Sequence, residues 1–316
     1  MTIAIWTLQL CAQSSSESSY PRRPVTIVLP FSVGGATDVM ARLAAQKMSA
    51  LLGYQVIVLN RDGAGGAIGT EFVAKSIPDG YTLLWGSSGP LALSPNLNAK
   101  LPFDPVRDFA PVGMFSLNPL VLTLHPSVPA NSVKALISLA KAQPGKLNYA
   151  SSGTGAAPHF AGEMFRNMSR IDIVHVPYRG AGLFAFDLVA GQVDFAFTSG
   201  TTVRDHFTSG RLKGLAVTST RRTELMPELP TMVEAGLAGY EVVIYYGLLA
   251  PAGTPASVLS TLGSALLTTL NDRDVKERIV AEGAYPSGGT PMQFAAFIKS
   301  ELFKYGRLAK EAGMIH

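Results

Sequence analysis

The chain has 316 residues, of which 47% are hydrophobic and 15% are charged, and its formal net charge is +4. This length and apolar content are enough for a large core and indicate two domains. Nucleic-acid binders normally carry a stripe of basic residues with aromatic residues between them, and this sequence has none. The small positive excess favours anionic ligands in general without selecting among them.

Cysteine and histidine usage argues against a metal site. A single cysteine, Cys11, cannot form an internal disulfide or a structural zinc site. The five histidines show no ligand spacing such as H-x-x-x-H; they are His125, His159, His175, His206 and His316. We therefore expect neither a metal nor another cofactor.

The first 21 residues differ in character from the rest. A short apolar run, residues 3–10, precedes a serine-rich stretch, but no basic residue occurs before Arg22. A secretory signal normally begins with positive charge. We interpret this segment as a truncated or mis-started export signal, with an unstructured tail as the alternative. No later segment reaches the roughly 18 apolar residues of a membrane span.

The elements that follow predict alternating strands and helices. Short β-branched runs at 25–30, 55–60 and 81–86 predict strands. Between the first two we expect a helix from about Thr37 to Leu52, capped by Thr37 or Asp38 and ended by Gly53. A shorter helix precedes the third strand. This β-α-β-α-β order predicts a parallel sheet covered by helices.

The middle of the chain repeats this order. Strands are expected at 119–125, 146–152, 171–178, 192–197 and 212–219, with helices after the first two. The run at 171–178 is apolar at most positions, which predicts a strand buried on both faces. After a further strand at 240–251 the chain ends in helices. The last helix places Phe294, Phe297, Ile298 and Tyr305 on one core-facing side.

Two strand-to-helix turns are candidate anion sites. The first is "SVGGATD", which contains Ser32, Gly34, Gly35, Ala36, Thr37 and Asp38. The first four N–H groups of a helix lack intrahelical partners, and its dipole favours negative charge. A phosphate or carboxylate fits such a place. An equally weighted alternative is a tight turn whose glycines serve only the backbone geometry.

The second turn is "SSGTGAAPHF", where Ser151, Ser152 and Thr154 supply hydroxyls and Gly153 and Gly155 open the backbone. Because the same feature occurs twice, we expect at least one to be functional. Two such turns suit a ligand with two carboxylates, or one group contacted from both sides. We expect His159 to support the site or the fold rather than to react.

Enzyme and nucleotide motifs are absent. The stretch "NRDGAGGAIG" fails the dinucleotide fingerprint because Ile68 stands at the third glycine position, and no P-loop occurs. Ser87 and Ser88 lie in "GSSG" rather than in a G-x-S-x-G nucleophile elbow. We therefore expect no enzyme activity, although a catalytic triad is recognised by geometry rather than by order.

Other polar residues near predicted strand ends are candidates for the same site. Tyr178 can donate from its hydroxyl, and Arg179 can pair with a carboxylate, although most arginines are surface charges. Phe31, Trp85, Tyr245 and Tyr246 line a cleft or pack in the core; among these, only Phe31 has neighbours that favour a cleft.

Several stretches, taken in order, resemble one family. They are "YPRRPVTIVLPFSVGGATDVMARLAA", "VLNRDGAGGAIGTEFVAKSIPDGYTLL", "DPVRDFAPVGM", "NYASSGTGAAPHFAGEMF", "HVPYRGAG" and "GLLAPAGTP". This set is similar to the tripartite tricarboxylate transporter substrate-binding receptors, also called Bordetella uptake gene receptors. The resemblance runs from about Tyr20 to the C-terminus.

The resemblance implies a two-lobed α/β periplasmic binding protein of type II, a Venus flytrap in which each lobe is a mainly parallel sheet flanked by helices. It implies one lobe from 22–123 and 247–316, a second from 124–246, and a cleft between them. The implied ligand is a small aliphatic or aromatic carboxylate, and the implied partners are membrane permease subunits. We expect a monomer. The ligand-binding positions that match the family are Phe31, Ser32, Gly34, Gly35, Ala36, Thr37, Asp38, Ser87, Ser88, Ser151, Gly153, Thr154, Gly155, Ala156, His159, Tyr178, Arg179, Gly180, Thr198 and Ser199.

Two departures from the family pattern concern the cleft. Tyr245 and Tyr246 stand where these receptors often carry tryptophan, and Trp85 is bulkier than expected before "GSSGP". The ligand is therefore not copied from any relative. A periplasmic sensor for the same ligand is the alternative function, followed by an enzyme on a similar scaffold.

Overall fold

The computed structural model describes residues 20–97, 100–311, 313 and 315. Most of the predicted export segment, residues 1–19, lies outside the described residues. Among the residues that are described, no helix is long and apolar enough to cross a membrane.

The first lobe is built on a three-stranded parallel unit. The strand β1 pairs in parallel with both β2 and β3. The helices α1 and α2 connect these strands. The bounds are β1 (Val25–Leu29), α1 (Ala36–Leu52), β2 (Val56–Asn60), η1 (Ala64–Gly66), α2 (Ala67–Ala74), β3 (Thr82–Ser87), η2 (Gly89–Leu93) and η3 (Ser94–Leu97).

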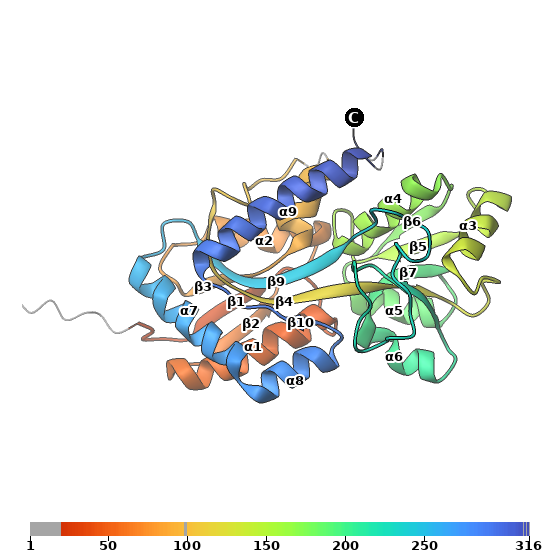
Figure 1. Ribbon diagram of the computed structural model, residues 1–316. Helices are drawn as coiled ribbons and strands as arrows, with labels where there is room; N and C mark the ends of the chain where they lie inside the picture. The colour runs from red at the N-terminus through yellow and green to blue at the C-terminus, as the bar shows by residue number, and fades with distance from the viewer. Residues whose placement is uncertain (1–19, 98–99, 312, 314, 316) are drawn as a thin grey trace, which may run out of the picture.

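The second lobe repeats the parallel unit, with β5 between β6 and β7. The helices α3, α4, α5 and α6 flank this sheet (Figure 1). The bounds are α3 (Val133–Ala142), β5 (Asn148–Ser151), α4 (Ala157–Ser169), β6 (Val174–Pro177), α5 (Ala181–Val189), β7 (Phe195–Ser199), α6 (Gly200–Thr208) and β8 (Lys213–Val217).

Two long antiparallel strands join the lobes, as Figure 1 shows. They are β4 (Phe109–Leu124) and β9 (Val243–Pro251). The strand β9 pairs with β3, and β4 pairs with β9 along 109–119 and then with β7 and β8 along 120–124. The strand order is β2-β1-β3-β9-β4-β7-β5-β6. The predicted two-lobed α/β fold is confirmed.

The chain then returns to the first lobe. Three helices and a short strand complete it: α7 (Ala256–Asn271), α8 (Arg273–Ala281), β10 (Tyr285–Pro286) and α9 (Pro291–Glu311). The helix α9 begins over the first lobe and runs toward the second (Figure 1). Its Phe294, Ile298 and Tyr305 are buried, as the sequence predicted, and Phe297 is partly buried.

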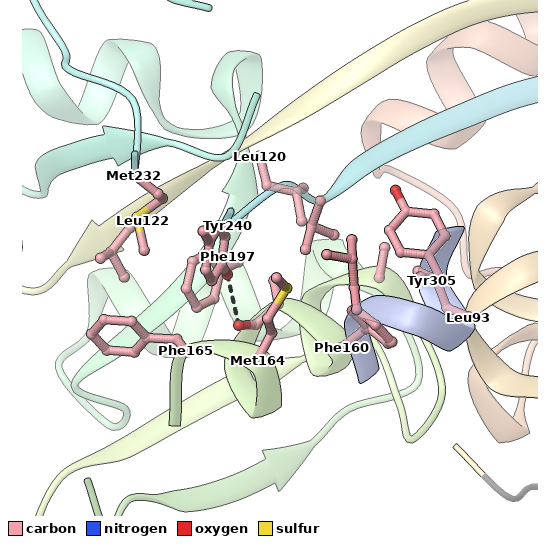
Figure 2. Packing of buried hydrophobic residues seen from close by; sticks show 14 of the residues in the cluster. Leu93, Leu120, Leu122, Phe160, Met164, Phe165, Phe197, Met232, Tyr240 and Tyr305 are labelled. Carbon is pink, nitrogen blue, oxygen red and sulfur yellow. Dashed lines mark hydrogen bonds between the residues drawn. The ribbon is translucent and has the colours of Figure 1, made fainter. Parts of the chain in front are cut away.

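One apolar cluster continues from lobe to lobe (Figure 2). The rings of Phe160 on α4 and Tyr305 on α9 meet edge to face, with their centroids 5.3 Å apart. The Tyr240 hydroxyl donates to the carbonyl of Ala161 at 2.7 Å. Because aromatic pairs and buried apolar area both favour contact, this cluster stabilises the lobes in the arrangement described.

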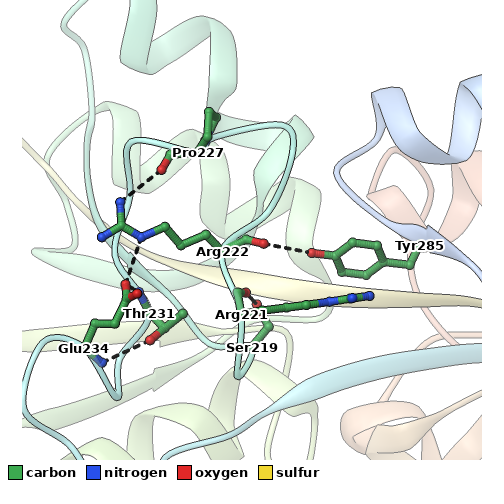
Figure 3. Close-up of polar contacts among 7 residues, drawn as sticks. All are labelled: Ser219, Arg221, Arg222, Pro227, Thr231, Glu234 and Tyr285. Atoms are coloured by element: carbon green, nitrogen blue, oxygen red, sulfur yellow. Dashed lines mark hydrogen bonds and ion pairs between the residues drawn. The ribbon is translucent and has the colours of Figure 1, made fainter.

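A polar contact also crosses between the lobes beside β4 (Figure 3). The Tyr285 hydroxyl of the first lobe donates to the carbonyl of Arg222 at 3.3 Å, and the Arg221 guanidinium lies 4.9 Å from the centre of its ring. Arg222 in turn is ion-paired with Glu234 at 2.9 Å. The segment after β8 is thereby tied to β10.

Two local predictions are wrong. The N-cap of α1 is Gly35, and neither Thr37 nor Asp38 caps it, since they are the second and third residues of the helix. The run at 171–178 is not a strand buried on both faces. Its strand β6 is the outer strand of the sheet, and Val174 is 48% exposed. The C-terminal end of α1 at Gly53 is confirmed, since that residue has the left-handed conformation.

Candidate ligand-binding site

A cavity of about 50 Å³ lies between the lobes, and side chains from both line it. The wall is formed by Phe31, Ser32, Gly35, Ala36, Thr37, Ser87, Gly89, Leu120, Ser152, Ala157, Pro158, Ala181, Phe184, Phe197, Ser199, Ile244 and Tyr246. Within the described residues, no arginine, lysine, aspartate or glutamate contributes to this wall.

The N-terminus of α1 opens onto this cavity. Gly35 is the N-cap and makes no side-chain cap bond, and Ala36 and Thr37 are the first two helical residues. The N–H groups at such positions have no intrahelical acceptor. All three residues line the cavity. The wall therefore presents unpaired backbone donors and the positive end of the α1 dipole.

Asp38 supports this turn from behind and does not line the cavity. Its carboxylate accepts hydrogen bonds from the Gly34 N–H (3.3 Å), Arg42 Nε (2.9 Å) and Asn60 Nδ2 (3.0 Å). Asn60 Nδ2 also donates to the carbonyl of Phe31. Burial opposes ionisation of Asp38, but these hydrogen bonds outweigh it and lower the pKa. The carboxylate fixes both ends of the turn.

Two hydroxyls of the first lobe reach the cavity wall without a partner. Ser87, at the end of β3, is 2% exposed, and its Oγ makes no hydrogen bond in the described part of the chain. The same holds for the buried Oγ of Ser32. Leaving a buried polar group unpaired costs about 1–3 kcal/mol. These two atoms are therefore available to a ligand.

A pair of hydrogen-bonded hydroxyls forms one side of the wall. Thr37 Oγ1 and the Tyr246 hydroxyl are 2.6 Å apart. Tyr246 comes from β9, where it stands opposite Ser87 of β3. Burial raises the pKa of Tyr246 to about 12, so that it keeps its proton. The sequence placed Tyr246 in either a cleft or the core, and the structure puts it in the cavity wall.

The second predicted turn has its amides largely occupied. The Gly153 N–H donates to Ser151 Oγ (3.1 Å), Gly155 N–H to His159 Nδ1 (3.1 Å) and Ala156 N–H to the carbonyl of Gly153 (3.1 Å). These residues and Thr154 are not in the wall. Their neighbours Ser152, Ala157 and Pro158 are.

The same turn touches the first lobe. Ser94 Oγ, in η3, donates to the carbonyl of Gly155 at 2.9 Å. A Cβ at Gly65 would lie 2.1 Å from the carbonyl oxygen of Thr154. The two backbones therefore approach as closely as glycine allows, and the lobes are in contact at this edge of the cavity.

His159 and His175, which we call the histidine pair, lie behind this turn. Their ring centroids are 4.3 Å apart, and His175 Nε2 is 2.7 Å from Ser151 Oγ. Burial lowers the pKa of each ring to about 4. Both rings are therefore neutral at neutral pH, which allows His159 Nδ1 to accept from an amide.

The remaining predicted residues divide in two. Ser199, the N-cap of α6, lines the cavity, and its hydroxyl is 2.6 Å from that of Thr202. Thr198 is buried against Thr123, and Tyr178 donates to Asp187 at 2.6 Å. Four others are also outside the wall: Gly34, Ser88, Arg179 and Gly180. Arg179 is exposed, and a Cβ at Gly180 would clash with Ser32 Oγ.

Sequence analysis did not identify the apolar part of the wall. It consists of Leu120, Ala181, Phe184, Phe197 and Ile244, together with Gly89. Phe197 and Leu120 lie in segments that the sequence predicted only as strands. Their exposure to the cavity depends on the way the two lobes face each other, which no local pattern records.

A cavity between two lobes joined by crossing strands, walled by helix N-termini and unpaired hydroxyls, is typical of a solute-binding protein of the flytrap class. Comparison with known proteins agrees. The profile of the "Tripartite tricarboxylate transporter family receptor" matches residues 40–314. The chain belongs to this receptor family and is a solute-binding receptor.

Individual relatives support this membership. The protein BugT of Bordetella pertussis is 37% identical over 98% of this chain and 95% of its own length. The structure of the periplasmic binding protein BugD is similar with a TM-score of 0.89, at 36% identity over 93% of this chain and 99% of that one. An R. palustris protein solved with adipate has a TM-score of 0.89 at 34% identity, over 93% of this chain and 98% of that one.

Proposed function

We propose that this protein captures a small carboxylate between its lobes in the periplasm and delivers it to the membrane permease of a tripartite tricarboxylate-type transporter. In this proposal the first lobe comprises 22–123 and 247–316, the second comprises 124–246, and the protein is a monomer without enzyme activity. The main support is the α1 turn, where unpaired amides and hydroxyls lie together and where no acidic side chain of the described part of the chain lines the cavity.

The chemistry of this end suits a carboxylate. A carboxylate accepts hydrogen bonds only, and the wall offers the amides at 35–37 and the hydroxyls of Ser32 and Ser87 as donors. Hydrogen bonds to a charged group contribute about 1.5–3 kcal/mol each, and a partly buried helix terminus up to about 2 kcal/mol. After the cost of ordering, a few of these reach the roughly −8 kcal/mol of micromolar binding.

The same geometry explains closure. A ligand at the α1 end also touches Phe197 and Ser199 of the second lobe, because all of these line one cavity. Ligand contacts with both lobes exist only when the lobes are together, so binding favours the closed state. The carboxylate bound by the R. palustris relative is consistent with this proposal.

The test uses the full-length chain, unfolded and refolded to remove any ligand that it carried. Its melting temperature is measured with carboxylates of several lengths and with the matching uncharged amides. A ligand that binds only the folded state raises the melting temperature as its concentration rises. We expect carboxylates to raise it and the amides not to. A shift with neither class, or with the amides equally, would contradict the proposed function.

A further inference from the structure

A second cavity lies between the lobes, across the crossing strands from the first one. Its volume is about 160 Å³, and we call it the hinge cavity. On β9, Ile244 lines the first cavity and its neighbour Val243 lines the hinge cavity, because successive side chains of a strand point to opposite faces. The crossing strands therefore separate two cavities, and the proposed function uses only one of them.

Polar contacts beside the hinge cavity join one lobe to the other. Lys304 Nζ of α9 is 3.6 Å from the carboxylate of Glu241, which precedes β9. The Tyr285 hydroxyl of the first lobe donates to the carbonyl of Arg222 in the second. Figure 3 shows the side chain of Arg221 extended toward Tyr285 at the same place. Because these partners come from different lobes, the shape of the hinge cavity depends on how the lobes are placed.

Two carboxylates in the wall share one cation. Glu301 is 6% exposed and is ion-paired with Lys304 at 2.7 Å. Among the described residues, Lys304 is also the cation that pairs with Glu241. Burial raises the pKa of Glu301, although Lys304 opposes the rise. A further positive charge between these carboxylates would therefore be favourable.

Arg221 supplies the opposite charge to the same wall. Its guanidinium forms no ion pair in the described part of the chain, and it lies outside ion-pair distance of both Glu241 and Glu301. The ring of Tyr285 holds it, with the guanidinium carbon 4.9 Å from the ring centre. A guanidinium presents a planar set of donors that matches a carboxylate. The wall thus favours a negative group at Arg221 and a positive group at the glutamates.

We propose that the hinge cavity is a second binding site, for a small zwitterion that carries an ammonium group and a carboxylate. The ammonium lies between Glu241 and Glu301, and the carboxylate pairs with Arg221. A short apolar body between the two charges packs against Phe297, which also lines the cavity. A molecule with one charge matches only part of this wall, so charge complementarity selects the zwitterion.

Occupancy of this site favours closure of the lobes. The zwitterion touches Glu301 of the first lobe and Arg221 of the second, and both contacts exist together only while the lobes keep this placement. A ligand shifts a conformational equilibrium through such differential contacts. By linkage, the zwitterion and the ligand of the first cavity each bind more tightly when the other is present. This coupling rests on the proposed function, whereas the site itself does not.

Titration calorimetry on the full-length, refolded protein tests the site. The probes are 3-aminopropanoate and 5-aminopentanoate, with propylammonium and propanoate as singly charged counterparts. We expect a zwitterion to bind, and to lose at least about 10-fold in affinity in Glu241→Gln and in Arg221→Gln. Binding of neither zwitterion, or binding that neither substitution weakens, overturns the inference. An equal loss for both singly charged probes in these variants overturns the choice of a zwitterion.

Matched controls are Glu277→Gln and Arg273→Gln, because these residues form an exposed ion pair on α8 outside both cavities. Their zwitterion affinity should be unchanged, and an equal loss there contradicts the assignment. Melting temperatures establish that all four variants are folded.

The coupling is measured by titrating a carboxylate with and without a saturating zwitterion. We expect several-fold tighter carboxylate binding when the zwitterion is present, and an unchanged dissociation constant contradicts the coupling. If no carboxylate binds, the proposed function fails, while the zwitterion titrations still decide whether the second site exists.

Discussion

Asp38 organises the α1 turn from behind, and its replacement is the most informative single change. The carboxyl is 4% exposed and accepts three hydrogen bonds, from Gly34, Arg42 and Asn60. In Asp38→Ala all three donors lose their acceptor. Asp38→Asn keeps the shape of the side chain, but its NH₂ group then faces the donors that the carboxylate had accepted from.

The magnitude follows from which donors reach water. Arg42 is half exposed, so the ion pair itself contributes less than about 1 kcal/mol. The bonds from Gly34 and Asn60 are partly buried, and hydrogen bonds to a charged group contribute about 1.5–3 kcal/mol. Two such bonds together predict that the free energy of unfolding falls by about 3–6 kcal/mol in Asp38→Ala, and by less in Asp38→Asn, which keeps one oxygen as an acceptor.

The pH dependence has a defined sign. The pKa of Asp38 is lower in the folded protein than its ordinary value, so the carboxylate stabilises the fold above the unfolded-state pKa of about 4. That stabilisation is lost as the pH falls through the lower, folded-state pKa. The difference in stability between the wild-type protein and Asp38→Asn should therefore be constant at neutral pH and shrink below about pH 4.

Urea unfolding and carboxylate titration together form the assay. Because the loosened turn no longer aligns its amides, we expect carboxylate affinity to fall at least about 10-fold along with stability. Asp272→Ala is the control: because Asp272 caps α8 and pairs with Lys47 far from the α1 turn, this variant should lose some stability and keep its carboxylate affinity. Unchanged affinity and unchanged stability in Asp38→Ala would refute the role given to this residue.

Three further changes probe the cavity and its closure. Tyr246→Phe removes the hydroxyl that is hydrogen-bonded to Thr37. We expect the free energy of unfolding in urea to fall by about 1 kcal/mol and ligand affinity to fall several-fold, and an increase in either quantity would contradict this role. Gly65→Ala places a Cβ against the Thr154 carbonyl, so small-angle scattering with ligand present should show that the lobes are held apart. Gly210→Ala is the control, because that glycine has a similar positive φ but open space around it, and the lobes of this variant should still close. The histidine pair has a lowered pKa of about 4, so stability should fall as the pH drops from about 6.5 to 4, and replacing both rings by glutamine should flatten that slope.

Local sequence patterns correctly predicted the features that depend on residues close together in the chain. The end of α1 at Gly53, the strands at 25–30 and 81–86, and the core-facing side of α9 all follow from periodicity and from the residues at helix ends. The α1 turn was identified because its glycines stand between a strand and a helix. Four of its members, Ser32, Gly35, Ala36 and Thr37, do line the cavity.

Patterns that depend on tertiary neighbours were beyond this reasoning. The strand β6 reads as fully buried, yet it lies at the edge of its sheet, because strand order is not written in a strand's own composition. Sequence analysis did not identify Phe184 and Phe197 as site residues, and only the approach of the first lobe makes them part of the cavity wall.

The turns before α1 and α4 look alike in sequence, and they share one hydrogen bond but differ in the others. Asp38 and His159 are both the third residue of their helix, and each accepts from the glycine N–H that precedes the N-cap. After that common bond, the α1 turn leaves the next three amides unpaired. The α4 turn instead bonds its N-cap amide to Gly153 and has proline at the second helical position. The first turn therefore leaves more donors free for an anion than the second, whose Gly155 carbonyl accepts from Ser94 across the contact between the lobes.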